Sequence, residues 1–470
     1  MSSPNLGSGP ITLADLPNEL VFIILEELDL EEIISVACLC RRLNYVALSY
    51  YIHRAMEPNR TATTSLWCSL SHTHGELSTL LFGALDAGYR LSFSLLKAIR
   101  LWLVMSPPIK DVTCMFSNDF AQEAEQVTRY FGTCPELDVL TLTFFSIHLG
   151  YSVEETEKQR NRATLEKLLR SLGRVVAGPL SRSLTLMGDL VIEEGGSAFD
   201  GPPLKNFETV HLSDSNFLFC PSFSDWTITS LNACCITSLR LNEVDIGPSL
   251  HQVQMDSLER LMILSCPRLL HSDLIPFLSR HAYITQLEAF LLGPAGNTVF
   301  TSGSLPNLTR VVGPMDFLLV GLALPSVMAS VADVAVSDSS ISPSIDDTQR
   351  LLSFVADRPS ITSLSISLDQ LNSTRDWLDY TGTRYEPQVA HLTRLRVNAL
   401  GFHFDEETTR RMVDAVSLFP QVDEFSMWAI MMGTEWEEEF LAKARETCHG
   451  LKAVGFSPTT KILLVSHLLP

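Results

Sequence analysis

An apolar triplet that recurs at a steady interval constrains the fold of this chain more than any other feature of its sequence. The triplet follows the pattern Leu-x-x-Leu-x-Leu with conservative replacements. From position 207 onward successive copies begin 22 to 31 residues apart. An interval of that size and steadiness is typical of a solenoid, in which each unit stacks on its neighbours. The clear copies begin at Ile109, Leu137, Phe207, Ile236, Leu258, Ile284, Val331, Ile361, Leu392, Val422 and Leu451, and weaker copies contain Leu184 and Leu308.

Each triplet predicts a short strand, because its second and third apolar positions alternate onto one face while the residues between them project from the other. Amphipathic stretches between the triplets predict helices that cover the apolar face. The predicted fold is therefore α/β, a right-handed strand-and-helix horseshoe or arc over residues 106–470. Another kind of αβ domain is the alternative. The predicted helices are Asp273–Arg280, Asp347–Ala356, Glu406–Leu418 and Glu435–Thr447, with a longer one that interrupts the phase between Tyr151 and Val176.

One copy, LERLMILSCPRL, places Cys266 and Leu269 where the cysteine-containing leucine-rich repeat has them, so the array resembles that family. Other copies lack the Cys or Asn of the motif, so the resemblance rests on the recurrence of the apolar triplet along the chain. Residues 57–105, ahead of the array, combine a polar stretch with apolar segments of helical spacing. We predict a linker and a helical cap there.

The N-terminal part predicts three short helices. Residues 1–10 are polar, and we predict that they are disordered. Residues 11–56 follow, and in them Leu20, Ile24 and Leu28 repeat at the spacing of a helix. Asp29, followed three residues later by Glu32, predicts a capping box that starts the second helix. Three helices this short hold a marginal core, so some of their apolar surface is expected to meet a partner.

The apolar order of this segment, from a Leu-Pro pair to a Val...Cys-Arg-x-Leu stretch, resembles the F-box. The resemblance implies a helical unit that docks on the Skp adaptor of a cullin-based ubiquitin ligase. A generic helical N-terminal cap is the alternative. An F-box joined to a degenerate repeat array also resembles fungal-type members of the F-box family. The residues that the resemblance implies to form or support the adaptor contact are Leu16, Pro17, Leu20, Ile24, Leu25, Leu28, Val36, Cys40 and Leu43.

Charge and composition narrow the possible partners. Acidic residues outnumber basic ones by 54 to 34, a formal net charge of -20, which works against binding to nucleic acid or anionic membranes. No secretory signal is visible, and the longest apolar stretch, residues 317–332, is interrupted and shorter than the roughly 20 residues that span a bilayer. Ten cysteines are too sparse for a disulfide scaffold. We expect an intracellular soluble protein, cytoplasmic or nuclear.

Catalytic motifs are missing from the sequence. It has no nucleophile elbow, phosphate-binding loop, zinc-protease motif or kinase motif set, and no Cys-x-x-Cys pair. We therefore expect a non-catalytic chain without cofactor or metal. The weak metal-ligand candidates, better explained as solvated or packed side chains, are His72, His74, Glu76, Cys38, Cys40, Cys234 and Cys235.

The positions between the strand leucines would form the concave wall of a horseshoe, where a target could bind. Arginines there could grip an acidic or phosphorylated segment, and aromatic side chains could anchor it. Because adjacent strands lie about 4.8 Å apart, Arg240 and Arg260 on consecutive units can be neighbours. Alternatively, the arginines are solvated and paired with local carboxylates such as Glu259 and Glu288. The candidate target-binding residues are Arg240, Arg260, Phe290, Arg310, Arg394, Arg396 and Trp428.

Together these features predict the substrate-recognition subunit of an SCF-type cullin ubiquitin ligase. Its F-box would bind the Skp-type adaptor and, through it, the cullin, while the concave repeat face would bind an unknown target protein. The rival hypothesis is a non-degradative F-box and repeat scaffold that binds a static partner. An enzyme built on a horseshoe-like domain is a third possibility, which the missing motifs disfavour.

Overall fold

The computed structural model describes 12–56, 79–83, 111–116, 120–132, 136–137, 139–144, 154–174, 176–177, 183–193, 196–290, 292, 299–337, 345–367, 389, 391–398, 419, 421–428, 442, 451, 453–457 and 461–464. The chain divides into two compact units, residues 1–235 and 236–470, and each is described by itself. In the part of the chain so described, no helix combines the length and the apolar character that crossing a membrane would require.

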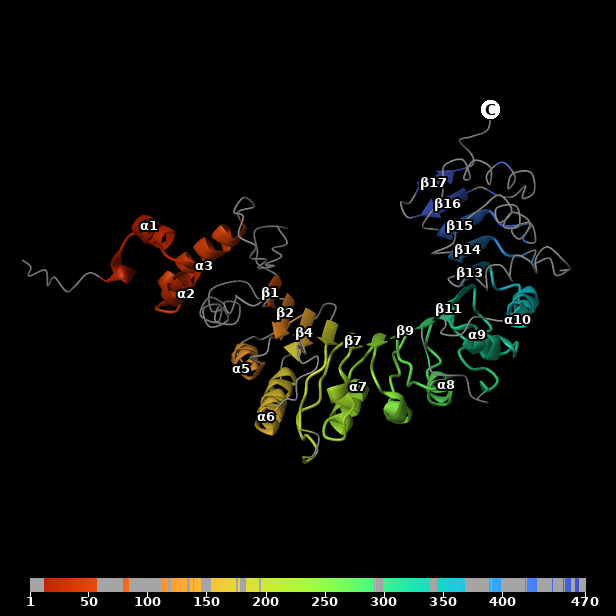
Figure 1. Ribbon diagram of the computed structural model, residues 1–470, viewed down its shortest axis with the longest axis horizontal. Helices are drawn as coiled ribbons and strands as arrows, with labels where there is room; N and C mark the ends of the chain where they lie inside the picture. The colour runs from red at the N-terminus through yellow and green to blue at the C-terminus, as the bar shows by residue number, and fades with distance from the viewer. Residues whose placement is uncertain are drawn as a thin grey trace, which may run out of the picture. The chain divides into compact units, whose positions relative to one another are not determined.

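Within the first unit, the N-terminal helices form a small helical bundle with its own core (Figure 1). Its elements are η1 (Leu13–Asp15), α1 (Asn18–Glu27), α2 (Leu30–Ala37) and α3 (Arg41–Met56). Val21, Leu25 and Ile33 are buried between the three helices. The predicted capping box is confirmed, because the Glu32 N–H donates to Asp29 Oδ1 at 2.8 Å and the Asp29 N–H donates to Glu32 Oε2 at 3.0 Å.

An open parallel sheet with the strand order β1, β2, β4, β6, β7 forms the rest of the first unit. Along β4 burial alternates, with Leu140 and Leu142 buried and Thr141 half-buried. Helices α5, α6 and α7 lie on one side of these strands (Figure 1). The bounds are β1 (Thr79–Gly83), β2 (Asp111–Phe116), α5 (Phe120–Phe131), β4 (Val139–Phe144), α6 (Glu155–Leu172), β6 (Ser183–Met187), β7 (Thr209–Ser213), η2 (Asn216–Phe219) and α7 (Ser224–Ala233), with a separate pair β3 (Glu136–Leu137) and β5 (Val176–Ala177).

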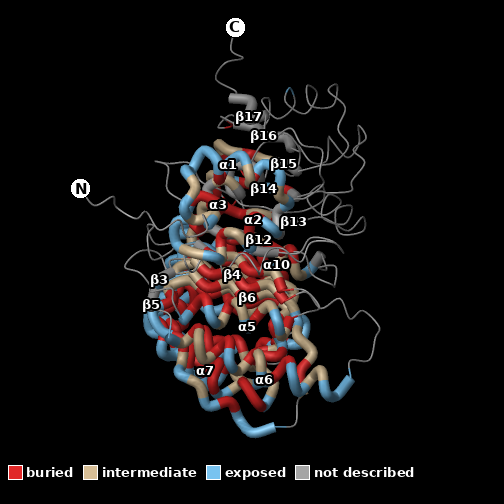
Figure 2. The backbone as a smooth tube through the Cα atoms, turned by 90° about the vertical axis from the view of Figure 1, so that its left-hand side faces the viewer, coloured by how far each residue is buried: buried red, intermediate tan, exposed pale blue. Residues whose placement is uncertain are grey.

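The second unit contains a parallel sheet in which strands β8 to β16 follow one another in chain order, and β17 joins β16 antiparallel. Burial alternates along these strands, as in β8, where Leu239 and Leu241 are buried and Arg240 is exposed, and buried and exposed segments alternate along the tube in Figure 2. The bounds are β8 (Ser238–Asn242), η3 (Gly247–Gln252), β9 (Arg260–Leu264), α8 (His271–Arg280), β10 (Gln286–Ala289), β11 (Arg310–Gly313), α9 (Met315–Leu322), β12 (Asp333–Val336), α10 (Ile345–Ala356), β13 (Ser363–Ser367), β14 (Arg394–Asn398), β15 (Glu424–Trp428), β16 (Ala453–Ser457) and β17 (Lys461–Leu464).

The triplets locate the strands accurately. From β7 to β16 each strand begins two residues after the first apolar position of its triplet, so Phe207 precedes β7 and Leu451 precedes β16. The predicted helices at 273–280, 347–356 and 151–176 are confirmed as α8, α10 and α6. The predicted helices Glu406–Leu418 and Glu435–Thr447 fall on positions that, apart from 442, lie outside the described residues.

One assignment in the segment 57–105 needs correction. Its described part, Thr79–Gly83, is a strand that pairs with β2, whereas the sequence predicted loop and helix there. The run TLLFG is too short for its apolar spacing to separate a helix from a buried strand. The neighbouring edge of β2 supplies hydrogen-bond partners to an extended backbone, which local sequence does not reveal.

His281, just after α8, is buried as a neutral imidazole. The Met255 N–H donates to its Nε2 at 3.0 Å, so the ring proton is on Nδ1, which donates to the Phe277 carbonyl at 2.7 Å. Burial lowers the pKa of His281, the Phe277 carbonyl raises it, nearby Arg280 lowers it and Asp256 raises it. Protonation of Nε2 would replace the acceptor of the Met255 N–H with a second donor, so this hydrogen bond would be lost.

We expect the stability of the second unit to fall on acidification. Because the pKa is lower in the folded than in the unfolded state, the folded state binds fewer protons, and stability is lost as pH falls through the ordinary histidine pKa near 6.5. The midpoint of thermal unfolding should drop between pH 7.5 and pH 5, and the drop should be smaller in His281→Gln. An equal drop in both proteins would contradict this role of His281.

Candidate interaction surfaces

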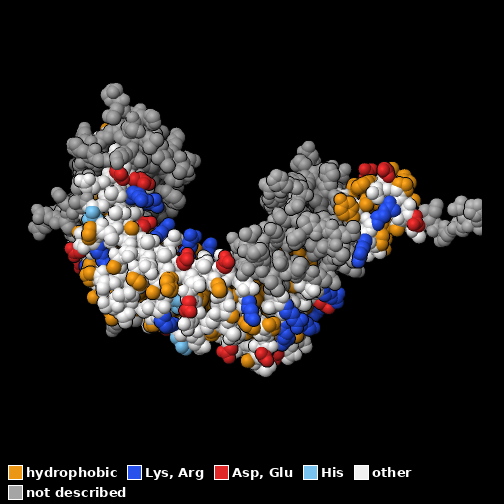
Figure 3. All heavy atoms as spheres, turned by 180° about the vertical axis from the view of Figure 1, so that it is seen from behind, with side chains coloured by type: hydrophobic (Ala, Val, Ile, Leu, Met, Phe, Trp, Pro, Cys, Tyr) orange, Lys and Arg blue, Asp and Glu red, His pale blue; other side chains and the backbone are white. Residues whose placement is uncertain are grey.

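The N-terminal helices expose several large apolar side chains. Helix α1 directs Val21 and Leu25 into the core, and the residues three apart on its other side, Leu20 and Ile23, are 46% and 58% exposed. The α2–α3 turn exposes Leu39 at 67%. Figure 3 shows hydrophobic side chains gathered on this unit among charged ones. Exposed apolar clusters of this kind mark interaction sites.

The structure divides the predicted adaptor-binding residues into surface and core. Leu20 and Pro17 are exposed, whereas Leu25 and Leu43 are 0% and 2% exposed. In this structure Leu25 and Leu43 are core residues, so they can support an adaptor contact from beneath but not make it. The half-buried members are Leu16, Ile24, Leu28, Val36 and Cys40.

Sequence reasoning missed other exposed apolar residues. Helical spacing from Leu20 could have identified Ile23, but Leu39 and Tyr45 fit no face of a single helix. Phe22 is 38% exposed and its ring lies 6.1 Å from that of Tyr50 on α3. We call Pro17, Leu20, Ile23, Leu39 and Tyr45 the exposed apolar set.

Arg42 fastens the segment before α1 to helix α3. Its guanidinium donates hydrogen bonds to the carbonyl oxygens of Ala14 and Leu16, and to Asn18 Oδ1 at 3.0 Å. A planar fork of donors suits several carbonyls at once. Arg42 therefore positions the Leu16-Pro17 turn, from which the exposed apolar set begins.

The strand face of the second unit carries the predicted arginines in a defined register. Arg240 pairs laterally with Met262, and Arg260 pairs with Ser238 on one side and Gln286 on the other. Arg240 and Arg260 therefore lie on adjacent strands, as the spacing suggested, but not directly opposite each other. They lie diagonally, two residues out of step, because Arg240 is the third residue of its strand and Arg260 the first.

Carboxylates on adjacent strands pair with two of these arginines. Arg310 lies between Glu288, at 3.4 Å, and Asp333, at 3.7 Å, and Arg394 lies 4.0 Å from Glu424. The alternative that local carboxylates pair with the arginines is confirmed for Arg310. Such partly exposed pairs contribute little to stability, about 0–1 kcal/mol each. They do reduce the net positive charge that a partner would meet at β11.

The other candidates differ in their accessibility. Arg240, Arg260 and Arg396 are exposed and have no ion pair with another described residue, while Phe290 is half-buried. The side chain of Trp428 lies outside the described part of the structure. Arg240 and Arg260 on β8 and β9, and Arg396 on β14, are therefore the candidate cations available to a partner on this face.

Metal or nucleophilic chemistry has no support from the described residues. They contain no group of three or more His, Cys, Asp or Glu side chains arranged as metal ligands. Burial raises the pKa of the Cys234 thiol, which keeps it protonated, while Cys235 is exposed and Cys38 and Cys40 are half-buried. The candidates His72, His74 and Glu76 lie outside the described residues.

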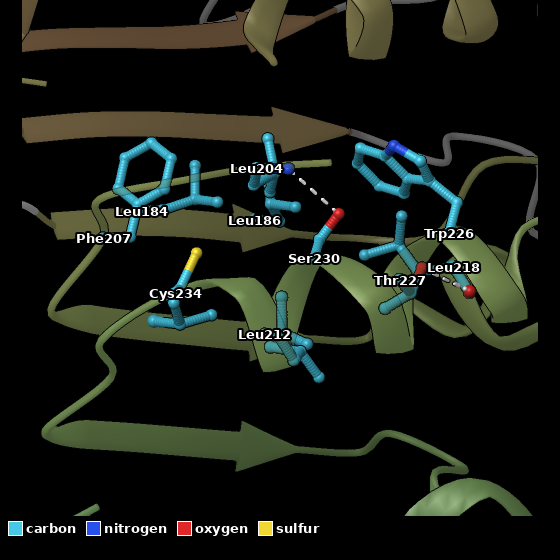
Figure 4. A pocket seen from close by; sticks show the side chains of 12 residues that line it. Leu184, Leu186, Leu204, Phe207, Leu212, Leu218, Trp226, Thr227, Ser230 and Cys234 are labelled. Atoms are coloured by element: carbon cyan, nitrogen blue, oxygen red, sulfur yellow. Dashed lines mark hydrogen bonds between the residues drawn. The ribbon is translucent and has the colours of Figure 1, made fainter. Parts of the chain in front are cut away.

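A cavity of about 20 Å³ lies between β6, β7 and α7 in the first unit (Figure 4). The Leu204 N–H donates to Ser230 Oγ at 3.1 Å, and the Thr227 hydroxyl donates to the Leu218 carbonyl at 2.8 Å. These polar neighbours are bonded within the protein, and the space has room for about one water molecule. It is a packing void of the core rather than a ligand site.

A protein-family model matches the same N-terminal helices that expose the apolar side chains. The F-box domain model matches residues 13–54, so the chain contains an F-box domain at this position. An F-box domain indicates binding to the Skp-type adaptor of a cullin ubiquitin ligase. No curated protein matches the chain.

Proposed function

We propose that this chain is the substrate-recognition subunit of an SCF-type cullin ubiquitin ligase. The observation that carries the proposal is the F-box domain at residues 13–54 together with the apolar side chains it leaves exposed. A unit this small leaves Leu20, Ile23 and Leu39 in water unless a partner covers them. The Skp-type adaptor is that partner, and the chain itself supplies binding rather than catalysis.

The target binds, in this proposal, on the strand face of a leucine-rich-repeat arc, of the fungal F-box type, formed by residues 106–470. The strands β7 to β16, each of which begins two residues after the first apolar position of its triplet, support the repeat assignment. We infer that the target segment is acidic or phosphorylated, because guanidinium groups bind such anions bidentately. The exposed side chains that support this inference are those of Arg240, Arg260 and Arg396.

Co-purification with a Skp-type adaptor and a cullin tests the proposal. The full chain should retain the adaptor at one-to-one stoichiometry and recruit cullin through it, whereas a version that lacks residues 1–56 should retain neither. Capture of the adaptor without cullin would favour the scaffold hypothesis. Failure of the full chain to bind the adaptor would refute the F-box function.

A further inference from the structure

Apart from histidines, every basic side chain between residues 206 and 442 is an arginine. This stretch of 237 residues contains 13 Arg and no Lys. The rest of the chain contains 8 Lys and 13 Arg, so 13 basic residues in that proportion would include about five lysines. The preference for arginine is therefore local to this stretch and is not a bias of the whole chain.

Local geometry requires arginine at some of these positions. The Arg358 guanidinium donates to the carbonyl oxygens of Leu322, at 2.7 Å, and Leu324, at 2.6 Å. Arg280 donates from Nη2 to the carbonyl oxygens of Leu250 and His251, both at 3.2 Å, and from Nη1 to the Pro276 carbonyl at 3.3 Å. The planar fork reaches separate carbonyls in a way that one ammonium group cannot reproduce.

Geometry does not require arginine at two exposed positions, 268 and 350. Among the described residues, Arg268 forms an ion pair with Asp245 alone, at 3.2 Å, and Arg350 with Asp347 alone, at 3.8 Å, and their side chains are 81% and 60% exposed. An ammonium group would make such single, solvated ion pairs equally well. The geometry of these two sites therefore does not explain the local preference for arginine.

The relevant difference between the two side chains is nucleophilicity. A guanidinium stays protonated at neutral pH, whereas lysine is the residue to which ubiquitin is attached. In that transfer the lysine Nζ, having given a proton to solvent, attacks the carbonyl of a ubiquitin thioester on a conjugating enzyme. The new C–N isopeptide bond forms, the C–S bond breaks, and the thiol leaves.

We propose that residues 206–442 form an amine-free surface that protects the receptor from self-ubiquitylation while it presents its target. The inference rests on the proposed ligase function. A domain that holds the target is carried to the ubiquitin thioester with it, and any lysine there would compete at high effective concentration. Self-modification then falls on lysines outside the stretch, of which the structure places Lys158 and Lys167 on α6 and Lys205 before β7.

Restoring amines to the surface tests the proposal. The variant Arg268→Lys/Arg350→Lys keeps both charges and adds two amines, and the matched control Arg268→Gln/Arg350→Gln removes the charges without adding amines. Each full-length chain is assembled with Skp-type adaptor, cullin, RING subunit, conjugating enzyme and ubiquitin. We expect a several-fold rise in ubiquitin on the lysine variant alone, with mass spectrometry locating it at positions 268 and 350.

The outcomes separate this inference from the proposed function. An assembled ligase that modifies Lys158, Lys167 or Lys205 but spares both new lysines would overturn the amine-free surface and leave the receptor function standing. An equal rise in the glutamine control would also overturn it, because loss of charge would then be the cause. A chain that fails to capture the adaptor would refute the receptor function, and this inference with it.

Discussion

Replacing Leu20 and Ile23 with aspartate is expected to abolish capture of the Skp-type adaptor. Both side chains are about half exposed on α1, so covering the exposed part of each by a partner contributes about 1 kcal/mol, roughly half of the value for a fully exposed side chain. A carboxylate buried without a partner at the same place adds a desolvation cost. The combined effect is a loss of affinity of at least about 100-fold, measured by titration of purified full-length chain with adaptor.

A matched control lies in the second unit. Leu270 and Val299 are 41% and 72% exposed, and Leu270→Asp/Val299→Asp introduces the same charges on surfaces outside the F-box. This variant should bind the adaptor as the native chain does. Circular dichroism should show both double variants folded, since exposed positions carry little of the stability. Native affinity in Leu20→Asp/Ile23→Asp would remove the exposed apolar set from the interface.

Replacing Arg358 with methionine is expected to destabilise the second unit by about 3 kcal/mol. The side chain is 7% exposed, and its guanidinium also donates to the Val327 carbonyl at 2.8 Å and the Met328 carbonyl at 3.4 Å, beside its bonds to Leu322 and Leu324. Methionine matches its length but donates no hydrogen bond, so all four carbonyls lose a donor, although those of Leu324 and Met328 keep the backbone N–H groups of Val327 and Val331. Leu322 ends α9, where the carbonyl carries part of the helix dipole's negative charge.

The same substitution on helix α10 provides the control. Arg350 is 60% exposed and, within the described part of the chain, pairs only with Asp347, so Arg350→Met should change the free energy of unfolding by no more than about 0.5 kcal/mol. Denaturant titration of both variants against the native chain measures the difference. A similar small change in both would show that the carbonyl contacts of Arg358 are satisfied by water when it is removed.

The sequence alone determined the local elements and the position of the F-box. Each triplet located its strand because alternation of apolar residues is a property of the strand itself, and Asp29 with Glu32 started α2 because a capping box needs only neighbouring residues. The Leu-Pro and Cys-Arg-x-Leu motifs identified the F-box for the same reason, since they lie within one short segment.

Only the tertiary structure decided which side of each element meets another. Leu25 and Leu20 share α1 and similar chemistry, yet one is core and the other surface, because α2 and α3 cover only one side of that helix. The register between β8 and β9 separated Arg240 from Arg260, and strands β10 and β12 brought carboxylates to Arg310 from more than 20 residues away. These outcomes depend on packing between segments distant in sequence, and local patterns carry no record of that packing.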